Sequence, residues 1–130
     1  MLRKLCNGLG FVIIFSLFMA PCSHGQEKDQ KRLSELMNRA DMLQSEGYYS
    51  QAADVVEYIL SLNQETSGKT SADIAESLDH LGELYYLAGK YKESEPLLQQ
   101  ALSIKKETYG TDHLNTAKTY GHLGILYNLT

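Results

Sequence analysis

The chain has 130 residues, 43% of them hydrophobic, with 12 basic and 16 acidic side chains and a formal net charge of −4. An acidic chain lacks the positive surface that binding to a nucleic-acid backbone requires, so we expect no nucleic-acid partner. The length is enough for one domain stabilised by an apolar core.

The first 25 residues differ from the rest of the chain. Arg3 and Lys4 precede an uncharged, mostly apolar run of 12 residues, 9–20, which Pro21 ends. This order is typical of a secretory signal peptide. A membrane-spanning helix needs about 20 apolar residues, and this run of 12 is shorter. An uncleaved membrane anchor is therefore only the alternative to a signal peptide. We predict a signal peptide over residues 1–25 and an exported protein, secreted or periplasmic, with no stable membrane span after cleavage.

The cleavage site has two candidates that place small residues where cleavage needs them, after Gly25 and after Cys22. Acylation of Cys22, as in bacterial lipoproteins, is a third option, although Pro21 is unusual before such a cysteine. Cys6 and Cys22 are the only cysteines. A mature chain that starts after either site therefore has no disulfide and no thiol nucleophile.

After the signal segment the chain repeats itself every 42 residues. Aligning residues 36–88 with residues 78–130 gives 15 identities over 53 positions, whereas chance would give about a fifth of that. The identical pairs include Gly47 and Gly89, Tyr49 and Tyr91, Leu60 and Leu102, Gly68 and Gly110, Ala75 and Ala117, and His80 and His122. An internal repeat is therefore the main organising feature of the sequence.

Each repeat contains two helical segments joined by a tight turn. Leu78, Leu81 and Leu84 recur at steps of three, along one side of an α-helix. Gly89 follows, where a left-handed residue ends a helix and lets the chain fold back. The predicted helices are 31–46, 50–64, 72–88, 92–108 and 113–128. The candidate N-caps are Thr70, Ser71 and Asp112.

Gly82 lies in the middle of its predicted helix, and the same repeat position holds Ala40 and Gly124. Glycine inside a helix costs about 1 kcal/mol relative to alanine. We therefore predict that the missing side chain lets the second helix of the hairpin approach closely.

The first helices resemble those of tetratricopeptide repeats, which follow the pattern W-x2-L-G-x2-Y. Residues 78–85, LDHLGELY, fit with Leu78 in place of Trp, and residues 120–127, YGHLGILY, fit equally well. Residues 36–43, LMNRADML, are degenerate, as expected for a terminal repeat. The resemblance implies an all-α solenoid of antiparallel helix hairpins over residues 26–130, with about two full repeats and the first helix of a third.

The period of 42 residues exceeds the usual tetratricopeptide period of about 34. In this respect the repeats resemble those of kinesin light chain. That family often has Asp-His-Pro at the join between repeats, whereas Leu114 follows Asp112 and His113 here.

The resemblance also implies a function, because first helices of successive repeats commonly line a concave wall that accepts peptides. We expect a non-catalytic scaffold or adaptor that binds another protein. Counting around the helices from Leu81 and Tyr85 gives the positions exposed on this wall. The candidate peptide-binding residues are Met37, Asp41, Gln44, Asp79, Glu83, Tyr86, Ile125 and Asn128. They predict a wall that is acidic at its middle and suits a basic, amphipathic segment rather than a C-terminal carboxylate.

Catalytic, metal and cofactor sites are not indicated. His80 and His122 recur at one repeat position, which packing explains better than a zinc site without a third ligand. Asp112 and His113 precede a helix, where capping residues are common. Residues 68–70, Gly-Lys-Thr, lack the earlier glycine of a phosphate loop. We expect no enzymatic activity, no metal and no cofactor.

Two other roles remain open at this point. Similar repeat arrays are joined to protease domains of the caspase-like CHAT type, so the chain could form the N-terminal repeat portion of a larger exported enzyme. Ile125 and Leu129 lack a following helix to cover them, which predicts a homo-oligomer through the last helix. Asn128 also begins an Asn-Leu-Thr acceptor for N-glycosylation.

Overall fold

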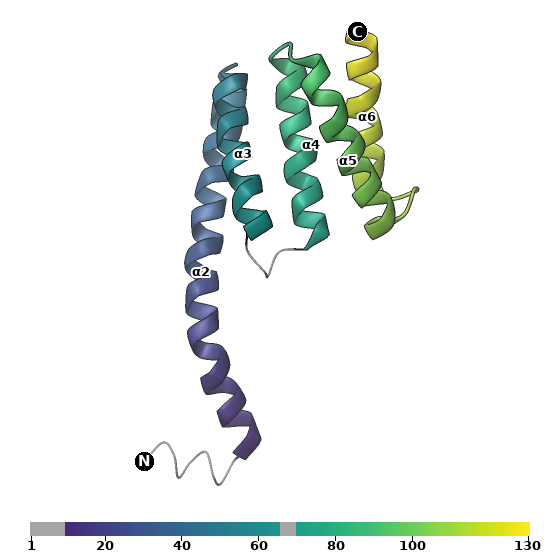
Figure 1. Cartoon of the computed structure of the whole chain (residues 1–130). Helices are drawn as coiled ribbons and strands as arrows, with labels where there is room; N and C mark the ends of the chain where they lie inside the picture. Colours follow the sequence, from purple (N-terminus) through teal and green to yellow (C-terminus); the bar gives the residue numbers. More distant parts are fainter. Residues whose placement is uncertain (1–9, 66–69) are drawn as a thin grey trace. The chain divides into compact units, whose positions relative to one another are not determined.

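The computed structural model describes the backbone of residues 10–65 and 70–130, and the side chains of residue 25 and of these ranges from residue 27 onward (Figure 1). The described residues form helices and no strand, which confirms the all-α prediction. The helices are α2 (Gly10–Ser45), α3 (Tyr49–Glu65), α4 (Ser71–Leu87), α5 (Tyr91–Tyr109) and α6 (Leu114–Leu129).

The helix boundaries agree with the predicted ones to within one residue, except at the start of α2. We predicted a start at residue 31, but α2 begins at Gly10. The helix continues through Pro21 and Gly25, which disfavour a helix interior, whereas Glu27, Lys28 and Gln30 just before position 31 have unbranched side chains that favour helix.

The contacts divide the chain into two compact units, Met1–Glu35 and Leu36–Thr130. Residues 1–9 of the predicted signal peptide lie outside the described residues, and that signal peptide stays a prediction. Among the described residues, no helix has both the length and the apolar character needed to cross a bilayer. Both hollows described below belong to the unit Leu36–Thr130.

Two hairpin turns use the same hydrogen-bond pattern. Gly47 and Gly89 have φ values of +84° and +81°, in the left-handed region that glycine adopts without strain. After each glycine the next N–H reaches back over the end of the helix, from Tyr48 to the Leu43 carbonyl and from Lys90 to the Tyr85 carbonyl, each at 2.8 Å. This Schellman pattern ends α2 and α4 at equivalent repeat positions.

The N-caps are only partly as predicted. Thr70 caps α4 in a capping box: its hydroxyl accepts from the Asp73 N–H at 3.3 Å, and its own N–H donates to the Asp73 carboxylate at 3.0 Å. The prediction of Asp112 as the cap of α6 is wrong. His113 takes this position, and its Nδ1 accepts from the Asn115 N–H at 3.2 Å, because the helix starts one residue later than predicted.

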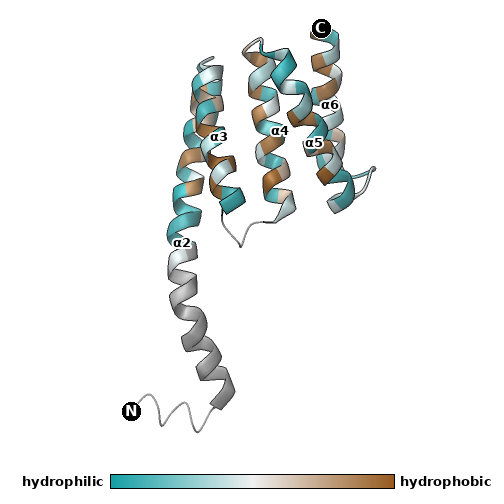
Figure 2. Ribbon diagram, in the orientation of Figure 1, coloured by the Kyte–Doolittle hydropathy of each residue, from teal (hydrophilic) through white to brown (hydrophobic). Residues whose placement is uncertain are grey.

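The core consists of two apolar clusters that share α4. Figure 2 shows hydrophobic residues in bands along α3, α4, α5 and α6, with hydrophilic residues between them. The first cluster joins α2, α3 and α4 and contains Ala40, Ala52, Ala53, Val56, Leu81 and Leu84. The second joins α4, α5 and α6 and contains Tyr86, Leu98, Leu123 and Leu126. Burying these side chains is the main stabilising term for stacked helices that are too short to be stable alone.

At Gly82, α5 packs tightly against α4. A Cβ atom at Gly82 would lie 2.6 Å from Cγ of Leu98, and Leu98 is fully buried. Nearby, the Ser94 hydroxyl donates to the Gly82 carbonyl at 2.6 Å. The predicted close approach is therefore confirmed. At Gly124, by contrast, a Cβ would meet no described atom within 4 Å beyond its own stretch of helix.

A buried ion pair network ties α4, α5 and α6 together. Asp79 of α4 and Lys105 of α5 are both fully buried, with 3.0 Å between Asp79 Oδ2 and Lys105 Nζ. The other carboxylate oxygen, Oδ1, lies 3.1 Å from Nδ1 of His122 on α6. Glu76 adds a contact of 3.4 Å to Lys105 from the surface. One carboxylate therefore holds partners from both neighbouring helices.

The pKa of Asp79 reflects this position. Burial raises the pKa, but the hydrogen bonds and charges of His122 and Lys105 outweigh burial and lower it from 3.8 to about 2. Asp79 therefore stays ionised in the folded state at all but strongly acidic pH.

Gly82→Ala should lower the free energy of unfolding by about 1–3 kcal/mol, because the new methyl group would overlap the buried Leu98 side chain. Chemical denaturation followed by circular dichroism measures this change. Gly124→Ala is the matched control and should raise the free energy of unfolding by about 0.5–1 kcal/mol in dilute solution, since only the helix propensity changes there. Stabilisation by both substitutions would contradict the close approach at Gly82.

Asp79→Asn should lower the free energy of unfolding by about 3 kcal/mol near neutral pH, because it leaves the buried Lys105 ammonium with only the partly exposed Glu76 as a counter-charge. The folded-state pKa lies below the unfolded value of 3.8, so the carboxylate stabilises the fold above about pH 4, and this stabilisation is lost as the pH falls through about 2. The difference between wild type and variant should therefore narrow by about 2 kcal/mol over that range.

Urea denaturation at a series of pH values measures this narrowing. The double variant Asp79→Leu/Lys105→Met serves as the control, because it removes both charges and should regain most of the lost stability. A difference between wild type and Asp79→Asn that stays constant down to pH 2 would show that Asp79 is not a stabilising anion.

Candidate functional site

A hollow lies between the first helices of successive repeats. It has a volume of about 270 Å³ and is lined from α2, α4 and α6. The lining residues are Met37, Asp41, Gln44, Glu76, His80, Glu83 and Lys118. The hollow therefore lies on the wall that the repeat pattern predicts as the concave surface.

A chain of hydrogen bonds fixes the floor of the hollow. The Gln44 amide nitrogen donates to Oε1 of Glu83 at 3.4 Å, and the Gln44 amide oxygen lies 2.9 Å from Nε2 of His80. An amide oxygen only accepts, so Nε2 of His80 carries the proton. Burial lowers the pKa of His80 below its usual 6.5 against the opposing pull of Glu83 and Asp41, which leaves the ring neutral at neutral pH.

The hollow is acidic. Asp41, Glu76 and Glu83 contribute three carboxylates, against the single ammonium group of Lys118. Their exposure differs: the Asp41 side chain is 65% exposed, whereas the Glu83 side chain is 23% exposed. Asp41 also lies 3.9 Å from Nε2 of His80. The polar groups of Gln44, Glu83 and His80 are bonded to one another, and solvent reaches the carboxylates of Asp41 and Glu83. These accessible carboxylates can bind cationic groups.

The structure brings together half of the predicted wall residues. Met37, Asp41, Gln44 and Glu83 all line the hollow. Ile125 and Asn128 are exposed on α6 but are not among the lining residues. Their part in peptide binding stays a prediction.

The predicted exposure of Asp79 and Tyr86 is wrong. Asp79 is 0% exposed and Tyr86 is 5% exposed. The Tyr86 ring packs at 6.1 Å from the ring of His122 and belongs to the core cluster with Leu123, and its burial raises its pKa to about 12. Both positions lie on the side of α4 that faces α6, so the next repeat covers them. A helical count identifies faces of one helix but does not show which face a neighbouring repeat occupies.

Three lining residues were missed by the sequence analysis, namely Glu76, His80 and Lys118. A signal for them existed. Glu76 and His80 precede Glu83 by seven and three residues, so the three share a helix face. Lys118 lies 42 residues after Glu76, at the same repeat position. His80 had been interpreted as a packing residue, and its bond to Gln44 agrees with that interpretation.

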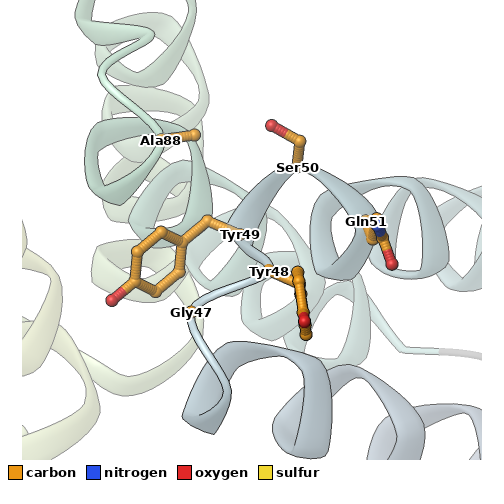
Figure 3. A pocket seen from close by; sticks show the side chains of 6 residues that line it. All are labelled: Gly47, Tyr48, Tyr49, Ser50, Gln51 and Ala88. Carbon is orange, nitrogen blue, oxygen red and sulfur yellow. The ribbon is translucent and has the colours of Figure 1, made fainter.

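A second hollow of about 250 Å³ lies at the hairpin turns. Gly47, Tyr48, Tyr49, Ser50 and Gln51 line it from the α2–α3 turn, and Ala88 lines it from the end of α4 (Figure 3). Figure 3 shows the side chains of Tyr48 and Ser50 pointing in different directions rather than toward one point. None of these six residues is charged, and the polar side chains among them are hydroxyls and one amide.

Within the described residues, no three His, Cys, Asp or Glu side chains are grouped closely enough to hold a metal ion.

The comparison with known families agrees with the repeat. Residues 32–107 and 73–130 each match the family model of the tetratricopeptide repeat. The two matches start 41 residues apart, 73 against 32, which is within one residue of the internal period. No curated protein matches the chain. The particular resemblance to kinesin light chain stays a prediction. Because the matches together cover residues 32–130, the chain belongs to the tetratricopeptide repeat family, whose repeats suggest a scaffold for protein–protein interaction.

Proposed function

We propose that the protein is an exported, non-catalytic scaffold that binds a partner protein through a basic, amphipathic segment of the partner. The segment lies in the hollow between α2, α4 and α6. The observation that carries this proposal is the excess of carboxylates in that hollow, on the wall formed by three successive first helices.

The chemistry of the hollow supports a cationic ligand. Asp41 is well exposed and Glu83 is partly exposed, so an arriving ammonium or guanidinium group can contact either carboxylate without first breaking a buried pair. Met37 adds an apolar surface beside them. A Lys or Arg side chain would lay its aliphatic stem on Met37 and place its charge near Asp41. The same carboxylates disfavour a partner's C-terminal carboxylate.

Pre-ordering of the wall supports useful affinity. Gln44 bonds to both Glu83 and His80, so these three side chains lose little freedom when a ligand arrives. The neutral His80 ring adds no positive charge that would oppose a cationic ligand. Because the carboxylates of the hollow are partly exposed, salt would screen their attraction for a cationic ligand, and binding would weaken as the ionic strength rises.

The non-catalytic part of the proposal rests on the partners of the polar groups. His80 would be the natural general base in the hollow, but its Nε2 is bonded to the Gln44 amide rather than to a Ser or Thr hydroxyl. Export rests on the basic start and the short apolar run of the first 25 residues.

Replacing Asp41 and Glu83 together by Lys should weaken binding of a cationic amphipathic peptide at least about tenfold, because attraction becomes repulsion at the centre of the hollow. The probe is a synthetic helical peptide of Lys, Leu and Ala with a fluorescent label. Its anisotropy measures the dissociation constant at low and high salt. A second peptide with Glu in place of Lys tests the sign of the charge.

Asp54→Lys/Glu107→Lys is the matched control. It changes the net charge by the same amount at two exposed positions on α3 and α5, outside the hollow. Binding should stay within about twofold of wild type, since charges a Debye length or more away are largely screened. Equal losses in both double variants, or equal binding of both peptides, would contradict the assignment of the hollow.

A further inference from the structure

The charges of the hollow are not spread evenly over the three helices that line it. Asp41 lies on α2, Glu76 and Glu83 lie on α4, and Lys118 lies on α6. The helix α6 contains no Asp or Glu, and Lys118 is its only Lys or Arg. The hollow is therefore acidic where α2 and α4 line it and basic where α6 lines it.

The internal repeat shows where the sign of the charge changes. Glu76 and Lys118 are 42 residues apart and share one repeat position, so a base on α6 stands where α4 has an acid. At the other acidic wall position, Asp41 and Glu83 are followed by Ile125, which is 46% exposed. Both acids that α4 contributes to the hollow are thus replaced at the equivalent positions of α6.

The three carboxylates of the hollow differ in what they already contact. Glu76 lies 3.4 Å from the buried ammonium of Lys105, and Glu83 accepts from the Gln44 amide at 3.4 Å. Asp41 is the most exposed of the three, with 65% of its side chain accessible against 45% for Glu76 and 23% for Glu83. A cationic group of a ligand would therefore reach Asp41 most easily.

Lys118 provides a binding group of the opposite sign. Its side chain is exposed, and among the described residues none forms an ion pair with it, although three carboxylates line the same hollow. Its charge is nevertheless felt at the floor. Burial is the main cause that lowers the pKa of His80, and the Lys118 ammonium acts in the same direction. An ammonium group that pairs with none of these carboxylates can bind an anionic group of a ligand.

We propose that Lys118 binds an acidic side chain of the partner, so that the bound segment places a basic residue at Asp41 and an acidic residue at Lys118. The inference rests on the proposed function, because it concerns the same hollow. A purely basic segment gains attraction at Asp41 but meets repulsion at Lys118. A segment with both charges is attracted at both places, so Lys118 selects mixed-charge segments over purely basic ones.

Blocked helical peptides of Leu and Ala with a single Lys test this selection. A second position, four, seven or eleven residues after the Lys, holds either Gln or Glu, since these spacings keep both side chains on one helix face. Acetylated and amidated ends leave only side chains charged. Fluorescence anisotropy at low salt measures the dissociation constant. For wild type, Glu should lower it about threefold relative to Gln at one of the spacings, as expected for a partly exposed ion pair.

Variants of Lys118 assign this gain to one side chain. Lys118→Gln should abolish the gain, and Lys118→Glu should turn it into a loss of about threefold, because like charges then meet. Both variants should still bind the peptide with Lys and Gln at least as tightly as wild type, since Asp41 is unchanged. Lys92→Glu is the matched control at an exposed position on α5, outside the hollow, and should keep the gain. Circular dichroism checks that each variant remains helical.

The outcomes separate this inference from the proposed function. Glu that never tightens binding to wild type at any of the three spacings would overturn the role of Lys118, and so would a gain that persists in Lys118→Gln. Either result leaves the binding of basic segments in place. A peptide with Lys and Gln that fails to bind wild type, or binds Asp41→Lys/Glu83→Lys equally well, would overturn the proposed function and this inference together.

Discussion

The arrangement of the last three helices depends on one buried carboxylate. Asp79 takes Lys105 from α5 with one oxygen and His122 from α6 with the other. A buried charge without a partner costs several kcal/mol, so moving α5 or α6 away from α4 would leave Asp79 or its partners unpaired in the core. The shape of the hollow depends on the position of α6, because α6 contributes Lys118 to a wall that otherwise comes from α2 and α4.

The two junctions between repeats use the same positions with different chemistry. His80 and His122 occupy one repeat position, and each lies 3.9 Å from an acid of the preceding first helix, Asp41 or Glu83. At the first junction the second partner is the amide of Gln44, which lines the hollow. At the second junction it is the buried Asp79 carboxylate. The repeat period determines which positions meet. The side chains at these positions determine whether the junction forms a solvent-accessible hollow or a buried ion pair.

The candidate binding surface of the unit Leu36–Thr130 would recognise a ligand mainly through charge. The hollow offers partly exposed carboxylates, which give attraction that salt screens and select cationic ligands.

Local patterns in the sequence were enough to predict the helices apart from the start of α2, the turns at Gly47 and Gly89 and the close approach at Gly82. Each depends on residues near in sequence or on the 42-residue period. Counting around the helices also predicted four of the seven residues that line the hollow, including Asp41 and Glu83. Tertiary structure decided the rest. Asp79 and Tyr86 have the helical positions of wall residues but are buried, because their environment is made by α5 and α6. Which flank of a helix a neighbour covers depends on packing between segments distant in sequence, and a periodicity within one helix carries no information about it.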